Sequence, residues 1–176
     1  MMDSRPDILT ASGRYFNFLA LENNVFDITE IAHALSNICR FTGHANEFYS
    51  VAQHCVMVSH LVPPEDALAG LLHDAAEAFL GDVSRPLKQL LPDYKAIEKL
   101  VEADVFRRFG LPSTLPASVK QADLVMLATE QRDLMPPHDD EWPVISHVTP
   151  LVETLMPWDN ISAKAAFLRR YCQLTA

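Results

Sequence analysis

The sequence predicts an all-α fold, a bundle of helices preceded by a short non-helical N-terminal arm. From residue 27 onward, apolar residues recur at the three- and four-residue intervals of helices that bury one face. Residue types that begin or end helices, chiefly Asp, Ser, Pro and Gly, stand at the edges of these periodic segments. Residues 1–26 show no helical period, so we expect them to form the arm.

The arm and the first helix are predicted by different patterns. Residues 10–18 alternate polar with aromatic side chains, which favours a short extended segment or a hairpin. Asp27 and Glu30 then have the spacing of a capping box, in which each side chain hydrogen-bonds to the other residue's backbone N–H. We expect this helix to run through Cys39, with its apolar face formed by Ile28, Ile31, Ala32, Leu35 and Ile38.

Two consecutive prolines separate the next two helices. Ser50 and Gln53 have the spacing of a second capping box, and the helix that they begin is expected to end at about Leu61, before the prolines. A third helix is predicted over Glu65–Leu80, which is apolar at helical spacing. Gly81 follows it, where a left-handed C-terminal cap is wanted.

Three further helices complete the predicted bundle. The spacing of apolar residues places them at Pro92–Gly110, Pro116–Leu134 and Asn160–Cys172. The first two of these helices have a proline in their first turn, where proline is favoured. The segment up to Leu91 and the Pro-rich residues 135–158 are predicted loops. A chain of 176 residues is long enough for one well-buried core and short for two, so we expect a single domain over residues 1–176.

Composition excludes several classes of partner. The net charge of −9 argues against general affinity for nucleic-acid polymers, which depends on Lys and Arg neutralising phosphates. No apolar run is long enough to span a membrane, and the first residues lack the pattern of a secretory signal. The three cysteines show no paired spacing. We therefore expect a cytoplasmic protein without a disulfide framework.

A metal-binding constellation is the main functional signal. The pair His73-Asp74 follows an apolar segment, where buried polar groups need a compensating charge or hydrogen bonds. Together with His54 and Asp123, it gives four candidate ligands on three predicted helices. Such nitrogen and oxygen ligands suit one divalent ion, namely Zn, Co, Mn, Fe or Mg. Each residue also has a structural alternative: a hydrogen-bonded helix histidine, a capping or ion-paired aspartate, or a chance dipeptide.

The longer motif around this pair resembles that of the HD-domain metal-dependent phosphohydrolases. The pattern His-Asp-x-x-Glu-x-x-x-Gly-Asp-x-x-x-Pro-x-Lys is matched over residues 73–88, after the Arg40-Phe41 pair and before Lys120-Gln121-Ala122-Asp123. Among these enzymes the chain is most similar to bacterial 5′-deoxyribonucleotidases and phage dATP triphosphohydrolases. The likeness covers about residues 31–134 and implies an HD-domain helical bundle, with His54, His73, Asp74 and Asp123 holding the metal.

The resemblance also implies a proton-transfer residue and a sugar contact. Glu77 follows His73 by four residues and Asp74 by three, so it is expected on the same helix face. The likeness makes it the general acid and base of hydrolysis; the alternative is a residue that only orients a ligand histidine. Asp82 resembles the carboxylate that reads the sugar, although an aspartate after a glycine also suits a turn.

Three cations and one aromatic residue complete the implied substrate site. Arg40, Lys88 and Lys120 are expected to contact phosphate oxygens, and for each the alternative is a solvated surface charge. Phe41 is expected to stack on the base, or else to be a core residue. The deoxyribonucleotidases have tryptophan at this position and a longer connection before the His-Asp pair. Because of these two differences, the resemblance specifies the type of reaction more closely than the range of substrates.

The expected function is therefore metal-dependent hydrolysis of deoxynucleotides, with additional ions possible alongside the substrate. Three candidate phosphate-binding cations favour a dNTP triphosphohydrolase, and the phage resemblance suggests dATP. The alternatives are a 5′-deoxyribonucleotidase acting on monophosphates, a non-catalytic nucleotide-sensing HD module, a helical interaction module and a cyclic-nucleotide phosphodiesterase. A sensing module would be expected to lack a ligand or Glu77, and none is missing. We also expect a homo-oligomer, with the arm either in a subunit contact or closing over the site.

Overall fold

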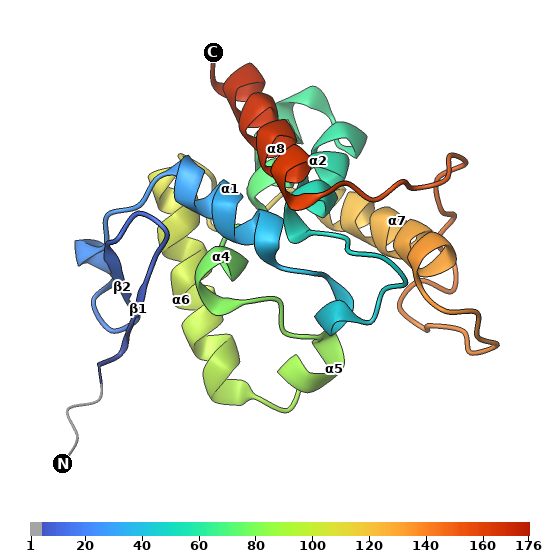
Figure 1. The fold of residues 1–176 in the computed structure, drawn as a ribbon, viewed down its shortest axis with the longest axis horizontal. Helices are drawn as coiled ribbons and strands as arrows, with labels where there is room; N and C mark the ends of the chain where they lie inside the picture. The colour runs from blue at the N-terminus through green and yellow to red at the C-terminus, as the bar shows by residue number, and fades with distance from the viewer. Residues whose placement is uncertain (1–4) are drawn as a thin grey trace.

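Helices dominate the part of the chain that the structure, a computed structural model, describes, namely residues 5–176 (Figure 1). Residues 1–4 of the expected arm lie outside the described residues. The prediction of a mostly helical fold is confirmed. The α-helices are α1 Ile28–Asn37, α2 Val51–Leu61, α3 Ala67–Leu72, α4 Glu77–Leu80, α5 Arg85–Lys88, α6 Pro92–Arg108, α7 Ala117–Leu134 and α8 Asn160–Thr175. Short 3-10 helices occur at η1 Leu21–Asn23, η2 Phe41–Gly43 and η3 Pro64–Asp66.

The N-terminal arm is a hairpin that packs on the helices. Its strands, β1 Asp7–Leu9 and β2 Tyr15–Asn17, pair antiparallel. The segment predicted to be extended, residues 10–18, contains the turn and β2, whereas β1 lies before it. Phe16 is only 2% exposed, and its ring stacks on that of Phe79 in α4 with centroids 4.0 Å apart. The buried carboxylate of Glu30 in α1 accepts hydrogen bonds from the hydroxyls of Thr10 and Ser12. The hairpin is thus attached to both α1 and α4.

Helix α1 begins with the predicted capping box. The Asp27 side chain accepts from the backbone of Thr29 and Glu30, and the Glu30 side chain accepts from the Asp27 N–H. The helix ends at Asn37, earlier than predicted, because Ile38 is extended and Cys39 forms a β-bridge with Ser50. This bridge places the next residue, Arg40, beside the start of α2.

The second predicted capping box forms only in part. Ser50 accepts a hydrogen bond from the Gln53 N–H, as expected for an N-cap. The Gln53 side chain does not return to Ser50. It donates to the carbonyl of Met156 and accepts from the N–H of Trp158, each at 2.8 Å. Gln53 therefore fixes the end of the long loop that precedes α8.

The prediction of one continuous helix over residues 65–80 is wrong at the motif itself. The chain forms η3 and α3, then a tight turn at residues 73–76, then α4. The His73 ring nitrogen Nδ1 bonds the Gly70 carbonyl, which a continuous α-helix would offer to the Asp74 N–H. The following N–H groups bond three residues back, as in Glu77 to Asp74. Gly81 ends α4 with a positive φ of +78°, as predicted for a glycine cap, but its ψ of 162° lies outside the left-handed helical region.

The other boundaries differ less from the sequence prediction. Helix α5 forms where a loop was expected, with a proline in its first turn. Helix α6 ends two residues before Gly110, α7 matches its predicted segment closely, and α8 extends to Thr175. The Pro-rich residues 135–158 contain no helix or strand. None of the helices in residues 5–176 combines the length and apolar character that a membrane crossing requires.

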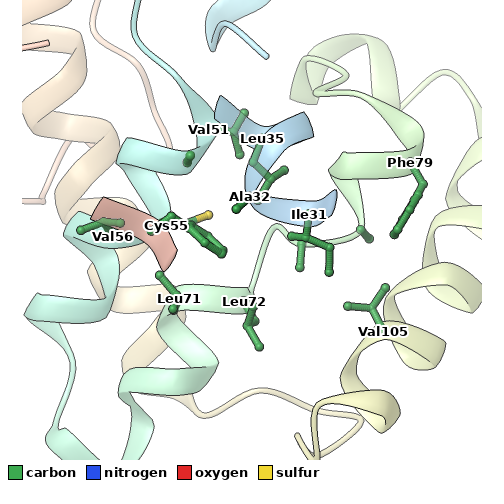
Figure 2. Packing of buried hydrophobic residues seen from close by; sticks show 14 of the residues in the cluster. Ile31, Ala32, Leu35, Val51, Cys55, Val56, Leu71, Leu72, Phe79 and Val105 are labelled. Atoms are coloured by element: carbon green, nitrogen blue, oxygen red, sulfur yellow. The ribbon is translucent and has the colours of Figure 1, made fainter. Parts of the chain in front are cut away.

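The main apolar core brings α2 and α3 into close contact. Figure 2 shows side chains from α1, α2, α3, α4 and α6 meeting around Ile31, Cys55 and Leu72. Gly70 in α3 lies directly against α2: a Cβ atom there would be 3.1 Å from the Cα atom of Ser59. This close approach brings the end of α3, where His73 begins the turn, next to His54 in α2.

Candidate metal and active site

The four predicted ligands converge on one point. The Nε2 atom of His54 in α2 lies 3.2 Å from Nε2 of His73, in the turn after α3. It also lies 3.2 Å from Oδ1 of Asp123 in α7 and 3.6 Å from Oδ2 of Asp74. His54, His73 and Asp123 each offer a ligand atom within 4.8 Å of the others. The structure therefore shows a histidine and aspartate group that could hold a metal ion.

Both histidines point the same ring atom at this centre. The Nδ1 atom of His54 contacts Oε1 of Glu130 at 2.6 Å, and Nδ1 of His73 contacts the Gly70 carbonyl at 2.8 Å. Because carboxylate and carbonyl oxygens accept, each Nδ1 carries the proton and donates it. Two Nε2 atoms then face each other, and their lone pairs repel unless a proton or cation lies between them. This orientation of the ring by a second partner is typical of metal-binding histidines.

Glu130 is the residue that sequence reasoning missed. Its side chain is fully buried, accepts a hydrogen bond from Nε of Arg40 at 3.1 Å, and lies 3.0 Å from the NH2 group of Arg40 in an ion pair. Burial raises the pKa of Glu130, but Arg40 and His54 outweigh burial and hold it below its usual value. Glu130 follows Asp123 by seven residues, two helical turns, and so lies on the same face of α7. That spacing was the available signal.

The charges around the centre are unbalanced toward the negative. Asp74, Asp123 and Glu130 adjoin the two histidines, while Arg40 is the one arginine or lysine that pairs with this carboxylate set in residues 5–176. Burial raises the pKa of Asp74, but the neighbouring His73 reverses this and holds the pKa far below its usual value. Burial lowers the pKa of His73, and Asp74 outweighs burial and raises it well above normal. Without a metal ion, protonated histidine rings thus offset the negative charge of the carboxylates. A divalent cation would take the place of these protons.

Glu77 lies beside this group with an unpaired oxygen. It begins α4, and its N–H donates to the Asp74 carbonyl. Burial, with the nearby Asp74 and Asp82 carboxylates, raises the pKa of Glu77 well above its usual value. Its Oε2 atom is buried and has no hydrogen-bond partner in residues 5–176. Buried polar atoms nearly always have partners, so this atom is suited to contact a bound molecule.

The cations predicted to bind phosphate are placed differently from one another. Arg40 is largely buried against Glu130, and its NH1 group lies 3.7 Å from Asp74 at the centre. Lys88 forms an ion pair with Glu98 of α6 at 2.5 Å. Lys120 is exposed on α7, one turn before Asp123, and has no ion pair among the described residues. Two of the three cations are therefore already neutralised by carboxylates.

The predicted base and sugar contacts lie at the edge of the site. Phe41 is half-buried, and the Arg40 guanidinium lies 5.5 Å from its ring centroid. Its backbone is left-handed, with φ +55°, and Thr42 has φ +54°. Asp82, just past α4, is half-buried, and burial raises its pKa. The structure thus brings Arg40 and Phe41 together and leaves the contacts of Asp82 with a sugar as a prediction.

The cysteines do not provide a better ligand set. Cys39, Cys55 and Cys172 are free thiols. The thiol of Cys55 lies close enough to His73 and Asp74 to form a second possible ligand group. Burial, however, raises its pKa to about 11, so the thiolate that would bind metal is scarce at neutral pH. Nitrogen and oxygen ligands therefore fit this centre best.

Comparison with known proteins gives two relatives. No sequence model of a protein family matches the chain. It is 44% identical over 170 residues to the uncharacterized protein YfdR of Escherichia coli K12, covering 96% of the chain and 95% of that protein. It is 36% identical over 121 residues to the uncharacterized protein RCAP_rcc00048 of Rhodobacter capsulatus, covering 63% of the chain and 62% of that protein. Neither name states an activity.

Proposed function

We propose that this chain, which belongs to the same family as the Escherichia coli protein YfdR, catalyses metal-dependent hydrolysis of phosphate esters of deoxynucleotides. One observation carries the proposal. Two histidine Nε2 atoms and two aspartates, brought together from α2, the turn after α3, and α7, meet beside a buried carboxyl oxygen of Glu77 that has no partner in residues 5–176. The resemblance to HD-domain phosphohydrolases supports the same reading of these residues.

The donor atoms fit a single divalent ion with room for other ligands. His54, His73, Asp74 and Asp123 would hold it, and the mixed nitrogen and oxygen set suits Zn, Co, Mn, Fe or Mg. When bound, such an ion supplies a Lewis acid for a phosphate oxygen and lowers the pKa of a coordinated water. Glu130 keeps the His54 ring in the required tautomer, and the Gly70 carbonyl does the same for His73.

Glu77 is the residue that would move protons. Burial and the neighbouring carboxylates raise its pKa, which favours the protonated carboxyl, the form that can donate to the leaving ester oxygen. As a carboxylate, it can accept a proton from the attacking water. The unpaired Oε2 atom is available for either contact. A nucleotide-sensing module would not need this group, so its position beside the ligands supports the catalytic proposal.

The cations favour a monophosphate substrate over a triphosphate. A triphosphate carries more charge than a monophosphate, and Arg40 and Lys88 are paired with Glu130 and Glu98. We therefore propose a 5′-deoxyribonucleotidase that releases phosphate. The second candidate is a dNTP triphosphohydrolase with dATP as substrate; the exposed Lys120, one turn from Asp123, is the observation that favours it.

Product analysis distinguishes the two candidates. Protein stripped with a chelator is incubated with Zn, Co, Mn or Mg and a panel of deoxynucleoside mono- and triphosphates. We expect inorganic phosphate and deoxynucleoside from the monophosphates. Triphosphate as product from dATP would establish the second candidate instead.

Matched variants tie the activity to the site. His73→Ala should abolish hydrolysis, whereas His60→Ala, which removes an exposed histidine of the same α2 helix that carries His54, should not. Absence of product from every substrate with every metal would contradict the proposed function. So would full activity in His73→Ala.

A further inference from the structure

A hollow with no role in the proposed chemistry is lined by the last turn of α7, the helix that carries Asp123 and Glu130, and by the loop that follows it. Its volume is about 450 Å³, within the range of small-molecule sites. Figure 1 shows the Pro-rich loop leaving the end of α7. Residues of both segments line the hollow. Among the lining residues are Gln131, Met135, His138, Trp142 and Ile145.

The rings of His138 and Trp142 line this hollow, and the ring of Phe41 lies beside Trp142. The rings of His138 and Trp142 are nearly parallel, at 14°, with centroids 5.9 Å apart. The Phe41 ring lies 6.2 Å from that of Trp142 at 53°. Flat aromatic side chains in a row are the surface on which nucleobases stack, whatever the base.

Phe41 connects this aromatic row to the metal ligands. It follows Arg40, whose guanidinium lies over the Phe41 ring and whose NH1 group is 3.7 Å from Asp74. On the other side, the lining residue Gln131 follows Glu130, the partner of His54. The backbone of Phe41 is left-handed, with φ +55°, and such strain is found at functional sites. Arg40, Phe41 and helix α7 therefore link the hollow to the ligand centre.

The charge of the hollow determines which end of a nucleotide it suits. Asp140 and Glu141 line it, and they repel phosphate. Its one arginine, Arg132, is engaged by both carboxylate oxygens of Asp133. An uncharged flat ring is compatible with these surroundings, while the phosphate is left to the ligand centre.

We propose that this hollow is the nucleobase subsite and that Trp142 stacks on the base of the deoxynucleotide. The proposal rests on the proposed function, and it assigns that site a specificity-determining residue in the Pro-rich loop. Phe41 then closes the edge of the subsite toward the phosphate. Hydrolysis of a base-free ester is independent of Trp142.

Fluorescence tests the stacking without relying on turnover. The chain has two tryptophans, so Trp158→Phe leaves Trp142 as the only reporter. In this variant, with Glu77→Gln added to prevent hydrolysis, dAMP should quench the emission and 2-deoxyribose 5-phosphate should not. Equal responses to the two compounds, or no response to dAMP, would overturn the subsite.

Kinetics give the second readout. Trp142→Ala should lower kcat/KM for dAMP by about tenfold, the loss expected when one base-stacking residue is removed. It should leave kcat/KM for 2-deoxyribose 5-phosphate unchanged, and Trp142→Phe should restore most of the dAMP activity. Equal effects on both substrates would defeat the proposal. If wild-type protein hydrolyses neither compound, the proposed function has failed, and the fluorescence result still decides whether a base binds here.

Discussion

Glu130 orients the His54 ring through a hydrogen bond on the side away from the ligand centre. Its carboxylate accepts the Nδ1 proton and is itself held by Arg40, all within a fully buried environment. The Nε2 atom of His54 is therefore free to face the other ligands. Replacing Glu130 would affect the centre although Glu130 is not among the converging ligand atoms.

Glu130→Gln should weaken metal binding by about 10- to 100-fold, the usual cost of losing a residue that orients a ligand histidine. The amide also removes the closer of the two ion pairs of the buried Arg40, so Tm should fall as well. Competition with a metal-binding dye measures the affinity. Glu98→Gln is the control, since it breaks the Lys88 pair and should leave metal affinity intact. Wild-type affinity in Glu130→Gln would contradict the role.

The sequence predicted which histidines and aspartates come together at this centre, but not Glu130. His73-Asp74 belongs to a long motif, and a buried pair of this kind requires compensation wherever it lies. A single glutamate on a helix is usually solvated, and only the packing of α7 on α2 shows that Glu130 meets His54. The break at His73 likewise depends on a side-chain hydrogen bond to Gly70 that periodicity does not reveal.

Glu77→Gln should abolish turnover while the protein keeps its metal. It should also change how the metal-free protein responds to pH. The folded pKa of Glu77 is raised above the usual 4.5, so the folded state holds a proton that the unfolded state releases, and stability falls as pH rises through this range.

Glutamine cannot ionise, so Glu77→Gln avoids the loss of stability that the wild type suffers when the Glu77 carboxyl loses its proton. The stability of Glu77→Gln relative to wild type should therefore be higher at pH 8 than at pH 5. Roughly 2–4 °C in Tm corresponds to about 1 kcal/mol in a chain of this size. Thermal unfolding with a chelator present measures it. An equal difference in Tm at both pH values would refute the raised pKa.

At the scale of elements, the close contact of α2 and α3 determines the distance between the two histidines. Gly70 has no side chain where a Cβ atom would meet the α2 backbone at Ser59 and a methyl group of Val62 at 3.2 Å. Backbone atoms cannot yield as a flexible side chain can. Any atom added here moves the end of α3, and His73 with it.

Gly70→Ala should therefore lower stability by about 1–3 kcal/mol, as overpacking does, and should also weaken metal binding. Gly110→Ala is the control, because Gly110 has φ +71° and open space around it. That change should cost stability through its backbone and leave metal affinity unaltered. Chemical unfolding and metal titration of both variants make the comparison. Equal metal affinity in the two variants would contradict the positioning argument.

The helix ends that were predicted well are those with local causes. The capping box of α1 and the glycine cap of α4 depend on residues a few positions apart. The Gln53 side chain was misjudged because its partners, Met156 and Trp158, lie about a hundred residues away. Helix α5 was missed because its four residues are too few to show a period.

For the whole molecule, the charge of −9 is partly concentrated at the ligand centre. Divalent metal should therefore stabilise the folded chain strongly. At 100 times its Kd, a ligand adds about 2.7 kcal/mol, or on the order of 5–10 °C in Tm. Thermal unfolding with and without Mn or Zn checks this, with reversal by chelator. A shift of the same size in His73→Ala would show that the metal binds elsewhere.

The N-terminal arm belongs to the same core as the helices. Phe16 packs on Phe79 two residues after Glu77, so the hairpin supports the element that carries the proposed acid and base. Leu9, Tyr15 and Leu19 of this region stay exposed. Packing within the chain therefore explains the burial of Phe16. The subunit contact expected for the arm stays a prediction.

The pairing of His54 with Glu130 spans 76 residues of chain. Closing so long a loop costs entropy that only the docked helices repay. No fragment that stops before α7 can hold the His54 imidazole in its working orientation, and the motif at residues 73–88 cannot be grafted alone onto another scaffold. During refolding, the chain should gain tight binding of a metal ion only late, after α7 has packed on α2.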